Sequence, residues 1–465
     1  MSPAGVATTE RPTRVRYWVI VFAVTLAIIT YIDRVSISYA ALFIRHDLGL
    51  SQSQMGWAFG AFGLAYALFE MPGGYLGDRI GPRKVLLRIV LWWSFFTAAT
   101  GRAWNLASIT TTQFLFGAGE AGCFPNLTKA FTIWLPAREK VRAQGSMWLS
   151  ARWGGAFTPP LVALVMGFVG WRNAFALFGL IGVVWAVLFY RWYRNDPRDN
   201  ARLNDAERRL LSQSATLATG HGDVPWRKLV GSRQVWMLCW QYFSLCYGWY
   251  FYITWLPTYL REARHVQMGA TAWLGILPLF FGGLGNPACV AALGWLRRRN
   301  VSVTHARRIM TTLGFAGAAS FLVFSTTRTA ALPAMLAIAM ASFCNDLVMP
   351  CAWGAAMDVG GKFAGTLSGA MNMWGNFAGF VAPVVIGHLL EWTHSNWNLT
   401  FYVSAGVYLT GIIFWMLLDP VTPIERYRAQ RHLAANPADA GLPVSFLASR
   451  GFVQSVRLRW HVAYW

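Results

Sequence analysis

The chain has little charge, and acidic charge is its scarcest kind. Asp and Glu supply 19 of the 465 residues, Lys and Arg supply 40, and the four types together make up 13% of the sequence. In a typical soluble domain about a quarter of the residues are charged. Hydrophobic residues instead make up 55%, and the mean hydropathy is +0.39. This balance argues against a water-soluble protein and indicates an integral membrane protein.

Cysteine patterns and catalytic motifs are also lacking. The six cysteines all fall in apolar stretches, without the spacing of a metal site or of an extracellular disulfide framework. The sequence contains no His-Glu-x-x-His, no Gly-x-Ser-x-Gly and no phosphate-binding loop. We therefore expect free thiols, no metal, no cofactor and no enzymatic activity. Residues 1–16 show no signal-peptide cleavage pattern, so we expect the first apolar run to act as an uncleaved insertion signal.

Apolar runs long enough to cross about 30 Å of hydrocarbon recur along nearly the whole chain. Because backbone groups in lipid must be satisfied internally, such runs favour helices. The sequence therefore predicts an all-α membrane protein with twelve transmembrane helices. The expected spans are 18–40, 53–75, 85–103, 108–131, 144–169, 171–190, 235–260, 270–296, 309–325, 332–357, 364–391 and 399–418.

The basic residues are distributed by loop. The formal net charge of +21 is compatible with a nucleic-acid partner, but Lys and Arg concentrate in alternate loops between the apolar runs rather than on one polar domain. Basic loops face the cytoplasm in membrane proteins. We therefore expect a multi-pass protein of the cell membrane, the inner membrane if the cell is bacterial, with both termini cytoplasmic and no nucleic-acid partner.

A polar segment divides the apolar runs into two groups of six, which predicts two six-helix bundles. Weak internal similarity supports a duplication, because Glu120 precedes Pro125 in the fourth run and Asp346 precedes Pro350 in the tenth. The expected parts are an N-terminal segment 1–16, a first bundle 17–193, a central loop 194–234, a second bundle 235–419 and a C-terminal tail 420–465.

Two opposite charges, Asp33 and Arg34, lie side by side inside the first apolar run. A charge at the centre of a membrane helix costs about 2.5–3.5 kcal/mol, whereas each Leu, Ile, Val or Phe returns only about 0.3–0.6 kcal/mol. Charges retained at that cost usually face a pathway rather than lipid. This pair is the strongest indication of function in the sequence.

The turn after the second apolar run, residues 73–84, reads Gly-Gly-Tyr-Leu-Gly-Asp-Arg-Ile-Gly-Pro-Arg-Lys. It resembles the loop signature of the major facilitator superfamily, which joins spans two and three of a chain divided six plus six. The resemblance implies that Asp78, together with Arg79 and Arg83, forms a latch between the bundles in the outward-facing state.

A second set of motifs is similar to the anion:cation symporter family of this superfamily. The matching segments are 31–34, Tyr66 with 72–74, 119–126, 255–260 and Trp353. Members of that family typically move sugar acids such as hexuronates, aldonates and aldarates, or other small carboxylates, together with protons. The resemblance implies proton-coupled uptake of a small organic anion, driven by the proton gradient.

The resemblance also implies roles for individual residues. Arg34 would hold the substrate carboxylate, with Tyr31, Tyr66, Trp353 and Asn372 lining the site, while Asp33 and Glu120 would exchange protons. A guanidinium offers a planar fork of donors that matches a carboxylate, which makes the role of Arg34 chemically reasonable.

The chain departs from the family at Gln113, where members usually carry an arginine two turns before Glu120. We hypothesise that Arg152, within the fifth run, supplies the missing charge and faces the substrate site. Asn376 is a further candidate for the pathway, although intramembrane polar groups of this kind also hold helices together through hydrogen bonds.

Other interpretations of the sequence remain open. A permanent salt bridge that stabilises the helices is the alternative role for Asp33 and for Glu120. The glycine pairs of residues 56–60, 365–369 and 375–379 fit static packing as well as a sliding interface. An exporter of drugs or metabolites with the same fold is the nearest alternative function, and a membrane-embedded enzyme, a passive channel or a non-transporting sensor are alternatives of other classes. We expect a monomer in the lipid bilayer.

Overall fold

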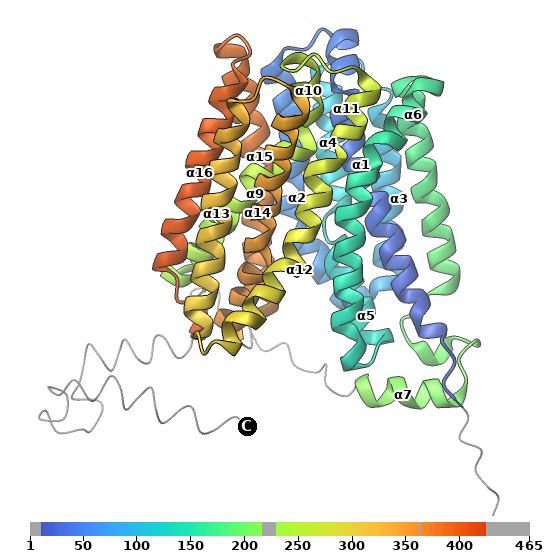
Figure 1. The fold of residues 1–465 in the computed structure, drawn as a ribbon. Coiled ribbons are helices and arrows are strands. Elements are labelled where there is room, and N and C mark those ends of the chain that lie inside the picture. The colour runs from blue at the N-terminus through green and yellow to red at the C-terminus, as the bar shows by residue number, and fades with distance from the viewer. Residues whose placement is uncertain (1–10, 216–228, 362–363, 425–465) are drawn as a thin grey trace, which may run out of the picture.

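The computed structural model describes residues 11–215, 229–361 and 364–424, and in these residues every regular element is a helix. The long helices run side by side, nearly parallel to one another, as Figure 1 shows. The helices are α1 (Trp18–Leu48), α2 (Gln52–Ile80), α3 (Pro82–Thr100), α4 (Leu106–Glu120), α5 (Cys123–Trp134), α6 (Ala137–Trp192), α7 (Asp205–Ala215), α9 (Arg233–Thr254), α10 (Leu256–Glu262), α11 (Met268–Leu274), α12 (Ile276–Arg298), α13 (Val303–Thr326), α14 (Ala331–Gly360), α15 (Ala364–Trp392) and α16 (Trp397–Leu417), with short 3₁₀ turns η1 (Val15–Tyr17) and η2 (Pro197–Asp199).

Each of the twelve expected spans has a helical counterpart. Among the described residues, seven helical segments are long and apolar enough to cross a membrane by themselves. One of these is α6, which contains two expected spans joined at Gly170, whose φ of 73° interrupts the helix. The remaining spans correspond to α2 and α3 and to the consecutive pairs α4–α5 and α9–α10.

Local sequence signals set several helix boundaries. Ser51 begins α2 as an N-cap that exchanges hydrogen bonds with Gln54, and Asn105 begins α4 in the same way with Ser108. Between α4 and α5 the backbone breaks at Gly122, whose φ of 82° is readily adopted only by glycine. This break places Glu120 at the end of α4, inside the protein.

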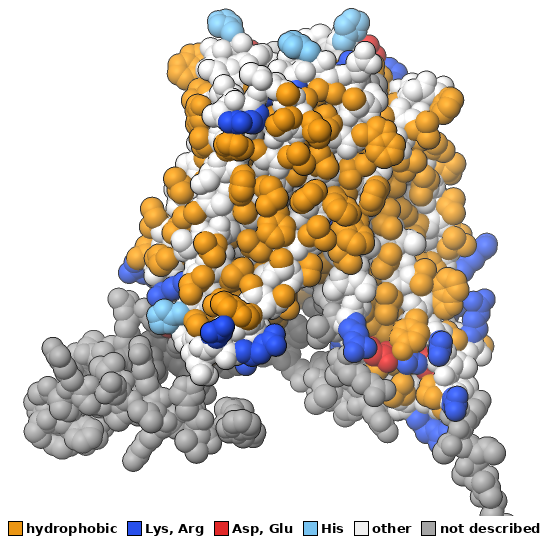
Figure 2. Space-filling model, viewed as in Figure 1, with side chains coloured by type: hydrophobic (Ala, Val, Ile, Leu, Met, Phe, Trp, Pro, Cys, Tyr) orange, Lys and Arg blue, Asp and Glu red, His pale blue; other side chains and the backbone are white. Residues whose placement is uncertain are grey.

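The exterior of the helices is apolar over most of their length. Figure 2 shows a broad band of hydrophobic side chains, with Lys and Arg side chains gathered mainly beyond its lower edge on this face. Large side chains such as Phe168, Leu180 and Leu188 are more than half exposed. Exposed apolar surface on this scale is compatible with lipid and not with water.

We call residues 11–215 the first half and residues 229–424 the second half. Helix α2 of the first half packs against α15 of the second, and α6 packs against α12. Glycines permit the closest approach, because a Cβ atom added at Gly63 would lie 2.4 Å from the carbonyl carbon of Gly379. The expected glycine pair 56–60 lies in the same interface, because Cβ atoms added at Gly56 and Gly60 would meet the backbone oxygens of Pro383 and Phe380.

Polar contacts between the halves gather near the end of the molecule that carries α10, here called the α10 end. Arg45 forms an ion pair of 2.6 Å with Glu262, and Glu391 accepts hydrogen bonds from the side chain of Ser51 and the backbone of Ser53. In the described part of the chain, the other polar contacts between the halves lie near this end or around the central cavity. At the opposite end, here called the α7 end, none of the contacts recorded between described residues joins the halves.

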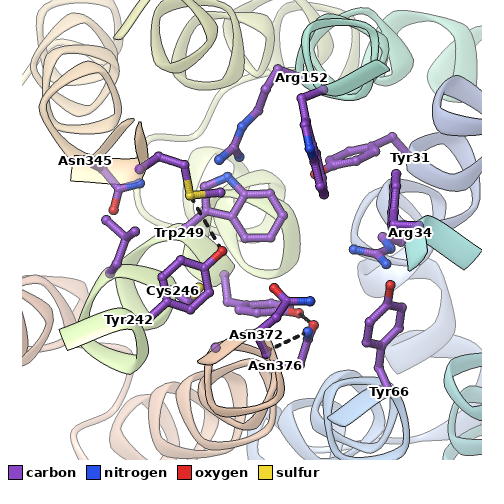
Figure 3. A pocket seen from close by; sticks show the side chains of 16 residues that line it. Tyr31, Arg34, Tyr66, Arg152, Tyr242, Cys246, Trp249, Asn345, Asn372 and Asn376 are labelled. Carbon is purple, nitrogen blue, oxygen red and sulfur yellow. Dashed lines mark hydrogen bonds between the residues drawn. The ribbon is translucent and has the colours of Figure 1, made fainter. Parts of the chain in front are cut away.

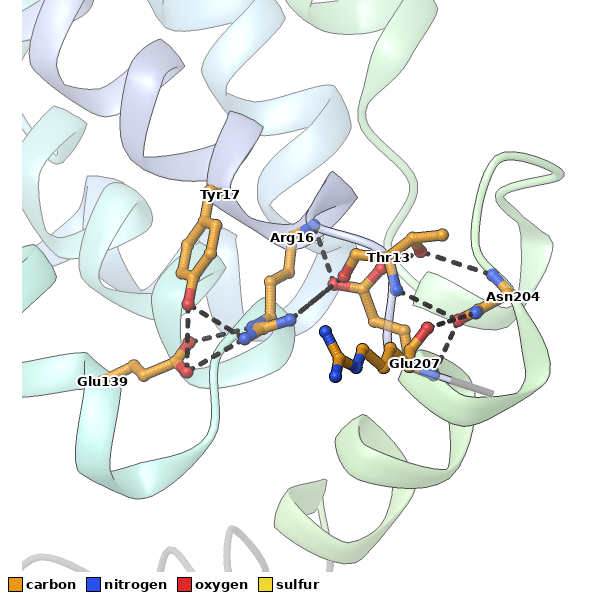
Figure 4. A network of polar contacts seen from close by, with 7 residues as sticks. Thr13, Arg16, Tyr17, Glu139, Asn204 and Glu207 are labelled. Atoms are coloured by element: carbon orange, nitrogen blue, oxygen red, sulfur yellow. Dashed lines mark hydrogen bonds and ion pairs between the residues drawn. The ribbon is translucent and has the colours of Figure 1, made fainter. Parts of the chain in front are cut away.

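Arg16 ties the first residues of the described chain to α6 and α7 (Figure 4). Its guanidinium bonds Glu139 through Nε and Glu207 through Nη1, both at 2.9 Å. Thr13 and Asn204 extend the network by a hydrogen bond of 3.2 Å. The central loop 194–234 is therefore partly ordered against the first half, while its residues 216–228 and most of the tail 420–465 lie outside the described residues.

Candidate functional site

A cavity lies between the halves near the middle of the long helices (Figure 3). Its empty volume, which includes space open to solvent, is about 650 Å³. The walls come from α1, α2, α5, α6, α9, α14 and α15. Six residues that the sequence singled out line it, namely Tyr31, Arg34, Tyr66, Arg152, Asn372 and Asn376.

Arg34 is held in place by Glu120. Its Nη2 lies 2.6 Å from Glu120 Oε1, and its Nε donates a hydrogen bond of 2.7 Å to the same oxygen. The guanidinium carbon also lies 4.8 Å from the centre of the Tyr66 ring and 5.1 Å from that of Phe62. The second carboxylate oxygen, Oε2, is buried and has no hydrogen-bond partner. The pair therefore keeps unused bonding capacity beside the cavity.

Arg152 forms a second buried pair, and this one joins the two halves. Its Nη2 donates a hydrogen bond of 3.0 Å to Oδ1 of Asp346 on α14, which also accepts one from Asn345. The guanidinium lies 4.8 Å from the centre of the Trp249 ring. Arg152 Nη1 and Asp346 Oδ2 are buried without a hydrogen-bond partner. Both arginines thus face one cavity, each with a single carboxylate partner.

Glu70 of α2 is a third buried acid. It lies behind the cavity lining, where its partners are neutral amides. It accepts hydrogen bonds from Asn372 and Asn376 of α15. Asn376 in turn accepts a hydrogen bond of 2.7 Å from the hydroxyl of Tyr250. Glu70 is buried, and no described Lys or Arg forms an ion pair with it. The carboxylate therefore joins the halves through amides alone.

Asp33 lies outside the cavity lining. Consecutive residues of a helix point in different directions, so Asp33 and Arg34 cannot face the same space. Both carboxylate oxygens of Asp33 are buried without a hydrogen-bond partner, and the indole of Trp93 lies close to them without hydrogen-bond geometry. Asp33 is thus the most isolated acid of the first half.

Trp353 also lies behind the lining. Its indole N–H donates to the hydroxyl of Tyr242 at 3.3 Å, and its ring centre lies 6.3 Å from that of Trp148. Tyr242 and Trp148 line the cavity instead. Trp353 can reach a bound molecule only through these two side chains.

From the sequence we expected Arg152 to supply the positive charge that is missing at Gln113. In the structure, Arg152 pairs with a different acid. Gln113 is buried and donates a hydrogen bond of 3.1 Å to Thr100. Arg152 is bound to Asp346, while Glu120 is bound to Arg34. Arg152 therefore does not replace the missing partner of Glu120, because a nearer acid on α14 has taken its guanidinium.

The expected latch is only partly described. The side chain of Asp78 lies outside the described atoms, and Arg79 is exposed. Arg83 donates hydrogen bonds of 3.1 and 2.9 Å to the backbone oxygen of Tyr190, and its guanidinium lies 4.2 Å from the centre of that ring. Arg83 therefore fastens α3 to the end of α6 within the first half.

The sequence drew attention to aromatic residues of α9, Trp249 and Tyr250 among them, but did not show which of them face a cavity. Tyr242, Trp249 and Tyr250 of α9 and Phe124 of α5 line the cavity. Trp249 and Tyr250 follow Tyr242 by seven and eight residues, which places all three on one helix face. That spacing was a usable signal, but α9 carries aromatic residues on several faces and the spacing alone does not select one.

Long apolar helices that enclose a cavity with buried, partly unsatisfied charges define a membrane transporter. The chain belongs to the Major Facilitator Superfamily, because the sequence model of that family matches residues 23–383. Membership confirms the expected fold and the expectation of a transporter in place of an enzyme.

Three similar proteins illustrate the family. A probable sulfoacetate transporter of Cupriavidus necator is 35% identical over 406 residues, which cover 85% of this chain and 92% of that protein. A probable L-galactonate transporter of Escherichia coli is 29% identical, covering 84% and 86%. A crystal structure of a bacterial homologue of the human lysosomal transporter Spinster, inward-facing and occupied, has a TM-score of 0.69 at 16% identity and covers 87% of this chain and 97% of that one. That last similarity bears on the fold alone.

Proposed function

We propose that this protein is a secondary active transporter that takes up a small organic anion together with protons by alternating access. The observation that carries the proposal is Arg34, a cation held in a cavity at the centre of the helices with tyrosine and amide side chains around it. The relatives support an anionic substrate, since they are named as transporters of sulfoacetate, galactonate, galactarate or glucarate, and hexuronate.

The ion pair with Glu120 supplies a mechanism for coupling. An isolated charge inside the protein is costly, so Arg34 needs an anionic partner at every stage. A substrate carboxylate can take that place only if Glu120 gives it up, and Glu120 gives it up at least cost when it accepts a proton. Binding of the anion and binding of the proton then support each other. Asp33, buried near Trp93 without a partner, is the second candidate proton carrier.

The contacts between the halves suggest how the cavity is exposed. In this structure they close the α10 end, through Arg45 with Glu262 and through the glycines of α2 and α15. With the cell membrane as location and cytoplasmic termini, as we propose, the α7 end faces the cytoplasm. The structure then corresponds to a state that has closed toward the outside. We propose that one chain suffices for the cycle.

Reconstitution in vesicles tests the proposal. An inward acid gradient is imposed, and uptake of labelled sulfoacetate, hexonates, hexuronates and aldarates is followed with and without a protonophore. We expect accumulation of at least one anion that collapses with the gradient and is lost in Arg34→Ala. Arg198→Gln is the matched control, because Arg198 pairs with Asp196 at the surface. Accumulation that is unaffected by Arg34→Ala would refute the role of the cavity, and the absence of any uptake would refute the function.

A further inference from the structure

Two arginines of the first half face the cavity, and each is neutralised by its own acid. Arg34 on α1 pairs with Glu120, and Arg152 on α6 pairs with Asp346. All four side chains are buried, so each pair has excluded most of the surrounding water. A substrate with one negative charge needs only one of these arginines.

Two aromatic rings in edge-to-face contact, Tyr31 and Trp249, connect the surroundings of the two guanidiniums. Arg34 lies 5.7 Å from the centre of the Tyr31 ring, Tyr31 lies 6.3 Å from the centre of the Trp249 ring, and Arg152 lies 4.8 Å from that same ring. Figure 3 shows both guanidiniums directed toward the interior, with Tyr31 between them. A molecule that lies beside these two rings in the cavity can therefore have one end at each arginine.

We infer that the substrate is a dianion with an acidic group at each end, one bound by Arg34 and the other by Arg152. This inference rests on the proposed function and narrows its substrate class. The unpartnered atoms fit such a ligand, because Arg152 Nη1 is a buried donor without an acceptor. A second carboxylate or a sulfonate supplies the missing acceptor.

Charge balance extends the inference to Asp346. When the dianion occupies both arginines, Glu120 and Asp346 each lose a cationic partner, and a buried carboxylate without a partner is costly. Each acid that accepts a proton removes this cost. Two protons then accompany one dianion, so the loaded carrier moves no net charge. In the empty carrier, the bond between Arg152 and Asp346 joins the halves and takes the place of the substrate.

Matched ligands separate this inference from the proposed function. Glucarate and gluconate differ only at one end, where gluconate has a hydroxymethyl group in place of a carboxylate. Sulfoacetate and isethionate differ in the same way. Competition against uptake in vesicles measures their relative affinities. We expect the dianion to bind about tenfold or more tightly than its partner in at least one pair, since a buried acceptor for Arg152 is gained. Equal affinities in both pairs would overturn the inference that the substrate is a dianion. They would leave the proposal of anion transport in place.

Substitutions at the second ion pair test its role. The double variant Arg152→Gln with Asp346→Asn leaves no unpaired charge, so its folding can be compared directly with that of the parent protein. It should bind the monoanion of each pair as the parent does and lose the preference for the dianion. Arg198→Gln serves as the control and should keep that preference. A double variant that retains the full preference would overturn the assignment of Arg152.

The electrical response tests Asp346. Asp346→Asn removes one proton site, so a dianion then enters with a single proton and carries net negative charge. An imposed potential, positive inside, should accelerate uptake by this variant and leave the parent protein unaffected. A purely structural role for Asp346 would lower the amount of folded protein without creating a response to potential. Uptake by the parent that already responds to potential would overturn the two-proton scheme.

Discussion

The contact between α2 and α15 makes a sharp prediction about the conformational equilibrium. A Cβ atom at Gly63 would lie 2.4 Å from the carbonyl carbon of Gly379 and 2.6 Å from the backbone nitrogen of Phe380. These neighbours are backbone atoms of a packed helix and cannot turn aside as a side chain does. Gly63→Ala should therefore disfavour the state described here, in which the α10 end is closed, and leave a state with that end open unaffected.

The size of the effect follows from the cost of overpacking. One added methyl group in a tight interface costs about 1–3 kcal/mol, and that cost acts on only one of the two states. The ratio of the states should shift roughly 5- to 150-fold toward the open α10 end. Gly406→Ala on α16 is the matched control, because no atom lies within 4 Å of a Cβ built there.

Spin-label distances across the α10 end measure the shift. Positions 104 and 392 are suitable, since Trp104 and Trp392 are 75% and 79% exposed and belong to different halves. In a cysteine-free background, Gly63→Ala should lengthen the main distance and slow transport, whereas Gly406→Ala should change neither. An unchanged distance in folded Gly63→Ala would refute the view that this contact closes the α10 end.

Two further predictions concern buried charges. Arg16→Gln removes the cation that pairs with the buried Glu207, so it should lower the stability of the detergent-solubilised protein by about 3–5 kcal/mol. The loss should be measured as a lower melting temperature. Arg198→Gln, at the surface, is the control and should not change that temperature. Glu70→Gln keeps the shape of the side chain and removes the charge of a carboxylate that has only amide partners. Because a buried charge without a cation is costly, this variant should raise the melting temperature at alkaline pH. Glu70→Ala removes the hydrogen bonds as well and should lower it. A destabilised Glu70→Gln would show that α15 is held by the negative charge or by the second acceptor oxygen, since glutamine offers only one acceptor to the two amide donors.

The sequence predicts the helices well because the membrane imposes their length. Runs such as 309–325 and 399–418 need about twenty apolar residues to cross the hydrocarbon, and no other structure satisfies the backbone there. Local spacing also places Tyr31 and Arg34, three residues apart, on one face of α1. These features depend on neighbours in the sequence and were predictable from it.

The partners of the charged groups were not predictable in the same way. Arg34 meets Glu120 and Arg152 meets Asp346 across 86 and 194 residues of chain, so no helical periodicity relates them. Which acid an arginine reaches depends on how each helix is rotated about its axis. The same rotation places Tyr242 in the cavity wall in front of Trp353.

One pair of helices links closure of the α10 end to the shape of the cavity. Gly63 and Glu70 are seven residues apart on α2, so they face α15 together, the first in the glycine contact and the second bonded to Asn372 and Asn376. Parting of α2 from α15 at Gly63 therefore draws Glu70 away from both amides. A buried carboxylate that loses all its hydrogen bonds is costly unless it gains a proton or water. Opening of the α10 end should thus require a change at Glu70, and Glu70→Gln should make that opening easier.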